Sequence, residues 1–267
     1  MVLHICRGLV FLAFLLMFCP VASWAALART TYTIQVSGSN HGTGAYTTGS
    51  FTPPDSSLLV VAAYQMTESG SGGADKSGDM TLGNSAGLTC TARVNAGDAN
   101  TFAVGVRIWT CPVTTGSSMT VNVDSAANNI YKYMVHIYAY TGYNTGTPTG
   151  ATATGTQAAS NGNFSITLSG APAATSEVVA VLGLNPGNGT IDVTPGTGWT
   201  EIYQTIVDWD NGSQSQIRNG STSTAVAWGA INGAGADTVQ AALEIIEGAG
   251  GGGGSVLPTL SLMGVGP

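Results

Sequence analysis

The sequence predicts an all-β fold: an antiparallel, jelly-roll-like β-sandwich built from two similar β units in tandem. Short runs rich in Val, Ile, Thr and aromatic residues recur along the chain, and Gly, Pro, Asn and Ser separate them. After residue 25, no stretch keeps the 3.6-residue apolar period of an amphipathic helix. A third observation, the likeness between the two halves of the chain, predicts the tandem arrangement.

The predicted strands are runs that end at clear turn sequences such as PPDSS, TTGSS and NPGNG. Outward strand positions are often Thr or Ser, which is usual for exported β proteins. In chain order the predicted strands are 30–36, 56–66, 88–94, 102–111, 119–123, 131–140, 163–169, 176–184, 199–207, 224–231 and 238–246. Many short strands at this spacing favour a sandwich over any mixed α/β fold.

The N-terminus reads as a secretory signal peptide over residues 1–25. A short basic start at Arg7 precedes an apolar run from Leu9 to Phe18, and small residues lead to cleavage after Ala25 or Ala26. The apolar run is too short to span a bilayer as a helix. We therefore expect a protein that is secreted or displayed at the cell surface, without a membrane span.

Two cysteines remain after the predicted cleavage, Cys90 and Cys111. Both lie in strand-like segments, and thiols of exported proteins tend to oxidise, so the sequence predicts a disulfide between them. Closing a loop of about twenty residues contributes roughly 3 kcal/mol in the chain-entropy model.

Composition excludes several classes of function. Charged residues are 8% of the chain and the net charge is −7, with 7 Lys and Arg in total. A nucleic-acid partner needs a basic surface, which so few cations do not build. The hydrophobic content of 43% also excludes an intrinsically disordered chain.

The halves resemble each other in pattern. SSLLVVAAY (56–64) matches SEVVAVLGL (176–184), and NSAGLTCTA (84–92) matches PGTGWTEIY (195–203). These matches predict a first β unit at 26–142, a linker-like segment at 143–161 and a second β unit at 162–248. A Gly-rich linker and a short apolar tail follow at 249–267.

One motif suggests catalysis. Gly83-Asn84-Ser85-Ala86-Gly87 fits the G-x-S-x-G nucleophile elbow, which makes Ser85 a candidate nucleophile with His136 or His41 as its base. That elbow requires a buried strand before the serine and a helix after it. The flanking residues are polar, Gly-rich and β-branched, so a Gly-rich β-turn is the simpler interpretation.

Paired carboxylates on a turn suggest calcium. Asp208 and Asp210 lie in the sequence DWDNGS, and calcium prefers oxygen ligands of this kind. The spacing departs from the usual Asp-rich calcium loop, so a solvated turn is the expected state, and no other cofactor is predicted.

The strand 131–140 (YKYMVHIYAY) is the richest aromatic run of the chain. Strand alternation divides it into two faces, and aligning Gly142 with Gly248 pairs the face of Tyr133 and Ala139 with an apolar set. The other face is then expected to be exposed and to bind sugar rings through Lys132, His136, Tyr138 and Tyr140. Tryptophans on neighbouring segments are added candidates, and they are Trp109, Trp209 and Trp228.

Taken together, residues 30–248 resemble β-sandwich domains of exported bacterial proteins and phage appendages. The resemblance rests on the repeated unit of turn, G-x-G-W-T-like strand, aromatic strand and Y-T-G ending. The polar-aromatic face of 131–140 and the lack of a coherent catalytic set predict a non-catalytic surface, adhesive or glycan-binding module, with a glycan or cell-surface polymer as partner. Two alternatives stay open: a structural or assembly subunit of a filament or virion appendage that forms homo-oligomers, and a serine hydrolase using Ser85.

Overall fold

The computed structural model describes residues 26–37, 42–67, 79–98, 103–125, 130–160, 163–185, 188–207, 211–234 and 236–248. Ala26–Gly248 forms one compact unit, distinct from 1–25 and 249–267. The predicted signal peptide and the predicted tail therefore lie outside the described residues and stay predictions.

The described residues contain strands and no α-helix, which confirms the all-β prediction. The strands of the N-terminal half (26–142) are β1 (Ala28–Thr31), β2 (Gln35–Val36), β3 (Tyr46–Thr47), β4 (Ser57–Thr67), β5 (Met80–Asn84), β6 (Thr91–Asp98), β7 (Val104–Val113), β8 (Val121–Ser125) and β9 (Ile130–Thr141). Those of the C-terminal half (149–248) are β10 (Thr149–Ser160), β11 (Phe164–Thr167), β12 (Glu177–Asn185), β13 (Asn188–Pro195), β14 (Thr200–Val207), β15 (Asn211–Asn219), β16 (Ala225–Ala234) and β17 (Ala236–Ile245).

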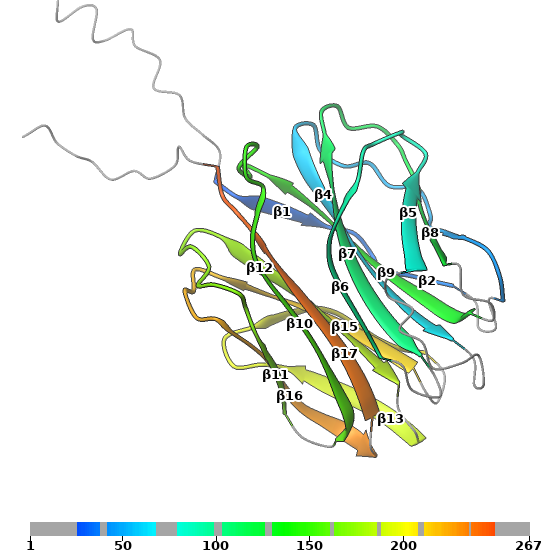
Figure 1. Ribbon diagram of the computed structural model, residues 1–267. Helices are drawn as coiled ribbons and strands as arrows, with labels where there is room; N and C mark the ends of the chain where they lie inside the picture. Colours follow the sequence, from blue (N-terminus) through cyan, green and yellow to red (C-terminus); the bar gives the residue numbers. More distant parts are fainter. Residues whose placement is uncertain are drawn as a thin grey trace, which may run out of the picture. The chain divides into compact units, whose positions relative to one another are not determined.

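The strands form four antiparallel sheets stacked in layers (Figure 1). Two large sheets lie in the middle, with strand orders β1-β9-β4-β7-β6 and β10-β17-β12-β15-β14, and β2 also pairs with β9. A three-stranded sheet, β3-β8-β5, covers the outer side of the first, and β11-β16-β13 covers the outer side of the second. Each half is thus a sandwich, and the two sandwiches pack large sheet against large sheet.

Three apolar cores hold the layers together. The central core joins the two large sheets and includes Val60, Tyr138, Val179 and Leu243. The other two cores lie inside the two sandwiches, one around Val61 and Ile137 and one around Ala180 and Trp228. Neighbouring residues of one strand therefore belong to different cores, because successive side chains point to opposite faces.

The prediction of a linker at 143–161 is wrong for most of that segment, because β10 forms the edge of a central sheet there. Its Thr, Gly and Ala residues are typical of a loop, but here they allow close packing. A Cβ added to Gly155 would lie 2.4 Å from Ile166, and one added to Gly150 would lie 2.1 Å from a Glu244 carboxylate oxygen. Small residues let neighbouring segments approach the strand at these points.

The two halves have the same strand order, and they share an irregularity. β6 pairs Thr91 with Thr110 and has a bulge directly after Ala92, and β14 pairs Thr200 with Ile217 and has a bulge directly after Glu201. These bulges fix structurally equivalent positions without any use of sequence similarity. A duplication of the sequence itself stays a prediction.

The structural equivalence differs by one residue from the alignment that the sequence suggested. Thr110 pairs with Val60 and Ile217 pairs with Val179, so Val60 corresponds to Val179, whereas the matched sequences place it opposite Ala180. In a strand, a slip of one residue moves every side chain to the other face. The separate alignment of Gly142 with Gly248, used for the faces of 131–140, is also off by one residue, because Tyr138 is equivalent to Leu243.

The predicted disulfide between Cys90 and Cys111 is present. It joins the positions directly beyond the Thr91–Thr110 pair, next to the start of β6. At the equivalent positions of the second half, directly beyond the Thr200–Ile217 pair, the Arg218 guanidinium lies 4.5 Å from the ring centroid of Trp199. The same cross-strand link is thus covalent in one half and a cation–π contact in the other.

The two ends of the compact unit meet at one corner, where β1 starts and β17 ends (Figure 1). The Leu27 amide donates to a Glu247 carboxylate oxygen at 3.3 Å, and the Gly248 amide donates to the Gly142 carbonyl at 2.8 Å. The connection between the halves passes through the same corner, since the Asn144 amide donates to the Ile246 carbonyl.

Candidate functional site

The predicted sugar-binding face of β9 is buried, so the expectation of an exposed face was wrong. The side chains of Lys132, His136, Tyr138 and Tyr140 are between 0% and 2% exposed. They point from β9 toward the second half, while Tyr133 and Ala139 point toward the three-stranded sheet of their own half. Both faces of β9 are covered because its sheet is an inner layer of the stack, which a search for one buried and one solvated face overlooks.

His136 makes a polar contact across the central core. Its Nε2 lies 2.9 Å from the hydroxyl of Ser213 on β15. That hydroxyl donates its own hydrogen to the Leu182 carbonyl at 3.0 Å, so it accepts from the imidazole and Nε2 carries the proton. Burial lowers the pKa of His136 from 6.5 to about 3, so the ring is neutral. A histidine that donates to a serine does not activate that serine as a nucleophile.

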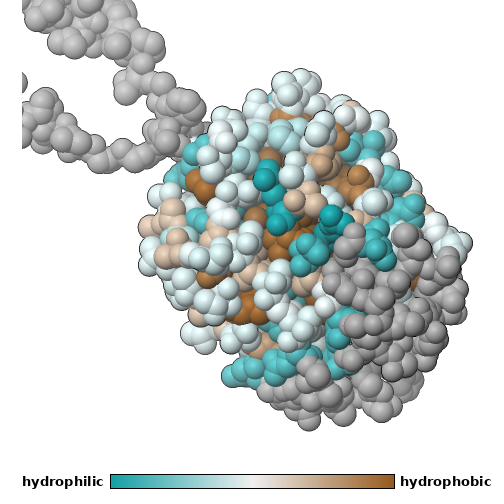
Figure 2. All heavy atoms as spheres, in the orientation of Figure 1, coloured by the Kyte–Doolittle hydropathy of each residue, from teal (hydrophilic) through white to brown (hydrophobic). Residues whose placement is uncertain are grey.

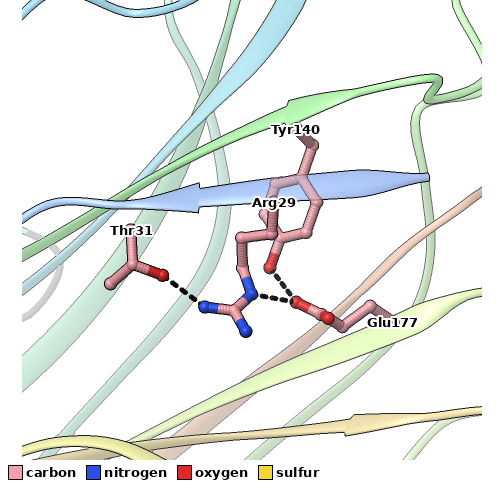
Figure 3. A network of polar contacts seen from close by, with 4 residues as sticks. All are labelled: Arg29, Thr31, Tyr140 and Glu177. Carbon is pink, nitrogen blue, oxygen red and sulfur yellow. Dashed lines mark hydrogen bonds and ion pairs between the residues drawn. The ribbon is translucent and has the colours of Figure 1, made fainter.

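An ion pair lies where the start of β1 approaches the start of β12 (Figure 3). The Arg29 Nε is 2.8 Å from a Glu177 carboxylate oxygen, and the same oxygen accepts a hydrogen bond from the Tyr140 hydroxyl. Arg29 also donates to the Thr31 hydroxyl. The Arg29 side chain is 17% exposed and that of Glu177 is 7% exposed, so the pair is largely removed from water.

This environment disfavours ionisation of the neighbouring phenols. Burial raises the pKa of Tyr140 well above its usual value, and the negative charge of Glu177 raises it further. Burial also raises the pKa of Tyr138. Both hydroxyls therefore stay protonated, and the Tyr140 hydroxyl serves as a donor to the carboxylate. The arrangement stabilises a buried charge rather than preparing a reactive group.

The structure does not place the other predicted sugar-binding residues on a surface. The Lys132 ammonium lies 5.9 Å from the ring centroid of Tyr131, and Lys132 is 1% exposed. Trp109 and Trp228 are core residues, 4% and 1% exposed. Trp209 and the predicted calcium ligands Asp208 and Asp210 lie outside the described residues, as does His41.

Ser85 sits in a turn, as the simpler interpretation of its motif expects. Its amide donates to the Thr120 carbonyl, and its hydroxyl accepts from the Thr120 amide at 2.9 Å. The preceding Asn84 spans the turn, accepting from the Leu88 amide at 2.8 Å and donating to its carbonyl at 2.9 Å. Gly87 has φ 69°, the left-handed backbone that glycine adopts without strain.

The structure does not bring Ser85 and His136 together. Ser85 follows β5 in the outer three-stranded sheet, whereas His136 points from β9 to the opposite side of the large sheet. A complete sheet therefore lies between the two side chains. Within the described ranges, no group of three or more His, Cys, Asp or Glu side chains is placed to hold a metal ion. The same ranges contain no helix long and apolar enough to cross a membrane.

The outer face of the N-terminal sandwich carries small polar side chains. Thr81 pairs with Asp124, and Gly83 pairs with Asn122 on the solvent side of the three-stranded sheet. On the face seen in Figure 2, most described residues are pale or teal, and hydrophobic residues occur in small separate groups. Scattered apolar residues of this kind are normal for a protein surface.

The polar residues that join the halves were missed at the level of sequence, namely Arg29, Glu177 and Ser213. The available signal was rarity: with 8% charged residues in the chain, an Arg or Glu in or directly before a strand-like run is unusual. A strand pattern predicts where such a residue lies but not which partner it meets.

Comparison with known proteins gives no relative: no protein family, no curated protein and no solved structure matches the chain. The chemistry of the described residues is therefore the basis for assigning a function.

Proposed function

We propose that the protein is a non-catalytic, exported structural module, a subunit of a cell-surface or appendage assembly. One observation carries the proposal: the polar side chains best suited to chemistry are used to join two β-sandwiches. His136 donates to Ser213, and Tyr140 and Arg29 share the Glu177 carboxylate. Buried polar contacts of this kind make the packing between the layers specific.

The adjoining chain ends support the same role. Because Leu27 and Glu247 are hydrogen-bonded, the first and last described residues lie at one corner of the body. If the C-terminal segment attaches the protein to an assembly, the opposite end and both outer sheets face other molecules. The disulfide between Cys90 and Cys111 supports an exported location, since such bonds persist in oxidising compartments. Adhesion or glycan binding stays a prediction without an assigned site.

The test is the location and state of the protein in its source cells. Antibodies raised against residues 26–248 are applied to intact and to permeabilised cells, and sheared surface material is separated by size. We expect labelling of intact cells and recovery of the protein in a high-mass fraction. Labelling that requires permeabilisation, or a serine-directed phosphonate probe that modifies Ser85, contradicts the proposal.

A further inference from the structure

The two inner sheets meet around a pair of structurally equivalent residues. The bulges of β6 and β14 make Val60 equivalent to Val179, and four residues further along each strand Tyr64 is equivalent to Gly183. Tyr64 and Gly183 also touch: a Cβ added to Gly183 would lie 2.3 Å from Tyr64 Cδ2. Equivalent positions of β4 and β12 thus face each other, as they do across a two-fold axis, although the two inner sheets approach each other more closely at β6 and β10 than at β1 and β14.

In this pair Tyr64 is the knob, a large side chain, and Gly183 is the hole into which it packs. The buried Tyr64 ring fills the space beside Gly183, and its hydroxyl donates to the Leu184 carbonyl at 2.8 Å. If two copies of the N-terminal half met in the same way, two tyrosines would require the same space beside the axis. If two copies of the C-terminal half met, two glycines would leave a void, which costs free energy in proportion to its volume.

The polar contacts across the interface are equally one-sided. By the same equivalence His136 corresponds to Ala241 and Ser213 corresponds to Val106. The equivalent pair, Ala241 and Val106, therefore has no polar side-chain atoms. The Arg29–Glu177 ion pair likewise takes its cation from the N-terminal half and its carboxylate from the C-terminal half.

From this asymmetry we infer that the inner faces of the two halves form a hetero-specific binding interface. Each half fits the other half and excludes a second copy of itself, so the halves stay assembled without a covalent link between them. The disulfide adds nothing to this link, because Cys90 and Cys111 both belong to the N-terminal half. The inference does not depend on the proposed function.

The test cuts the folded protein between its halves. A recognition sequence for a site-specific protease is inserted between Gly146 and Thr147, both exposed in the connecting turn. The flanking residues stay anchored, since the Asn144 amide donates to the Ile246 carbonyl and the Ile246 amide to the Pro148 carbonyl. After cleavage, gel filtration reports whether the two fragments travel together. We expect elution at the volume of the uncut protein, whereas separate fragments or a self-associated N-terminal fragment overturn the inference.

Variants at Tyr64 and Gly183 test the specificity of the interface between the halves. Gly183→Leu is expected to separate the cut fragments, and Tyr64→Ala in the same chain is expected to bring them together again. Gly170→Leu is the matched control, because a Cβ added to Gly170 meets nothing within 4 Å and this chain should behave like the parent. If Gly183→Leu does not fold even uncut, recovery of folding in the double variant supports the inference. A double variant no better folded or assembled than Gly183→Leu contradicts it.

Discussion

The buried imidazole of His136 predicts a specific loss of stability in mild acid. In the folded protein its pKa is about 3 because burial disfavours the charged ring, whereas the ordinary value of 6.5 applies in the unfolded chain. A lowered pKa means that the unfolded chain binds the proton more readily. The contribution is therefore intact above pH 6.5 and decreases as the pH falls from 6.5 toward 3.

The size of the effect follows from the same two values. Each pH unit between them removes about 1.4 kcal/mol from the free energy of unfolding. Lowering the pH from 7 to 5 is thus expected to remove about 2 kcal/mol through His136 alone, out of the roughly 5–15 kcal/mol that is usual for folded proteins.

The assay compares the protein with His136→Gln, which keeps an N–H donor for Ser213 but does not titrate. Urea unfolding at pH 7 and pH 5 gives the free energy of unfolding of both proteins. All other ionisable groups are the same in the two proteins, so the difference between the proteins isolates His136. We expect this difference to shift by about 2 kcal/mol in favour of the variant between the two pH values. An unchanged difference would falsify the placement of a neutral imidazole in the central core.

Three further perturbations test the fold and the motif. Replacing Cys90 and Cys111 by alanine removes a crosslink between residues 21 apart and is expected to lower the free energy of unfolding by about 3 kcal/mol in urea titrations, a loss that reduction of the parent should reproduce. Tyr140→Phe removes the hydroxyl that donates to Glu177 and should lower the free energy of unfolding by about 2 kcal/mol. Glu177→Gln should then cost less in that variant than in the parent, and strictly additive costs contradict the shared contact. Ser85→Ala removes one acceptor in an exposed turn and should cost about 1 kcal/mol or less; a phosphonate probe that labels the parent but not this variant would instead assign a nucleophile.

The error about the aromatic strand shows where sequence reasoning stopped. The period of two correctly separated Tyr133 and Ala139 from His136 and Tyr138, and the structure places these sets on opposite faces of β9. What the period does not contain is the number of layers. A sheet between two others buries both faces. The polar residues of one face then form hydrogen bonds and ion pairs with the facing sheet instead of contacting water.

The sequence by itself determined the all-β class, most strand positions, the disulfide and the turn around Ser85, because these depend on local pattern and on pairs of residues in neighbouring strands. It overlooked β5, β13 and β15, and also β10, whose small residues resemble a loop until Ile166 and Glu244 are seen packing against them. Only the tertiary structure decided that two sandwiches stack through their large sheets, with Tyr64 against Gly183 and Arg29 against Glu177. The physical reason is that such contacts join residues more than a hundred positions apart, and a side chain's role there is set by the shape and charge of its distant neighbour.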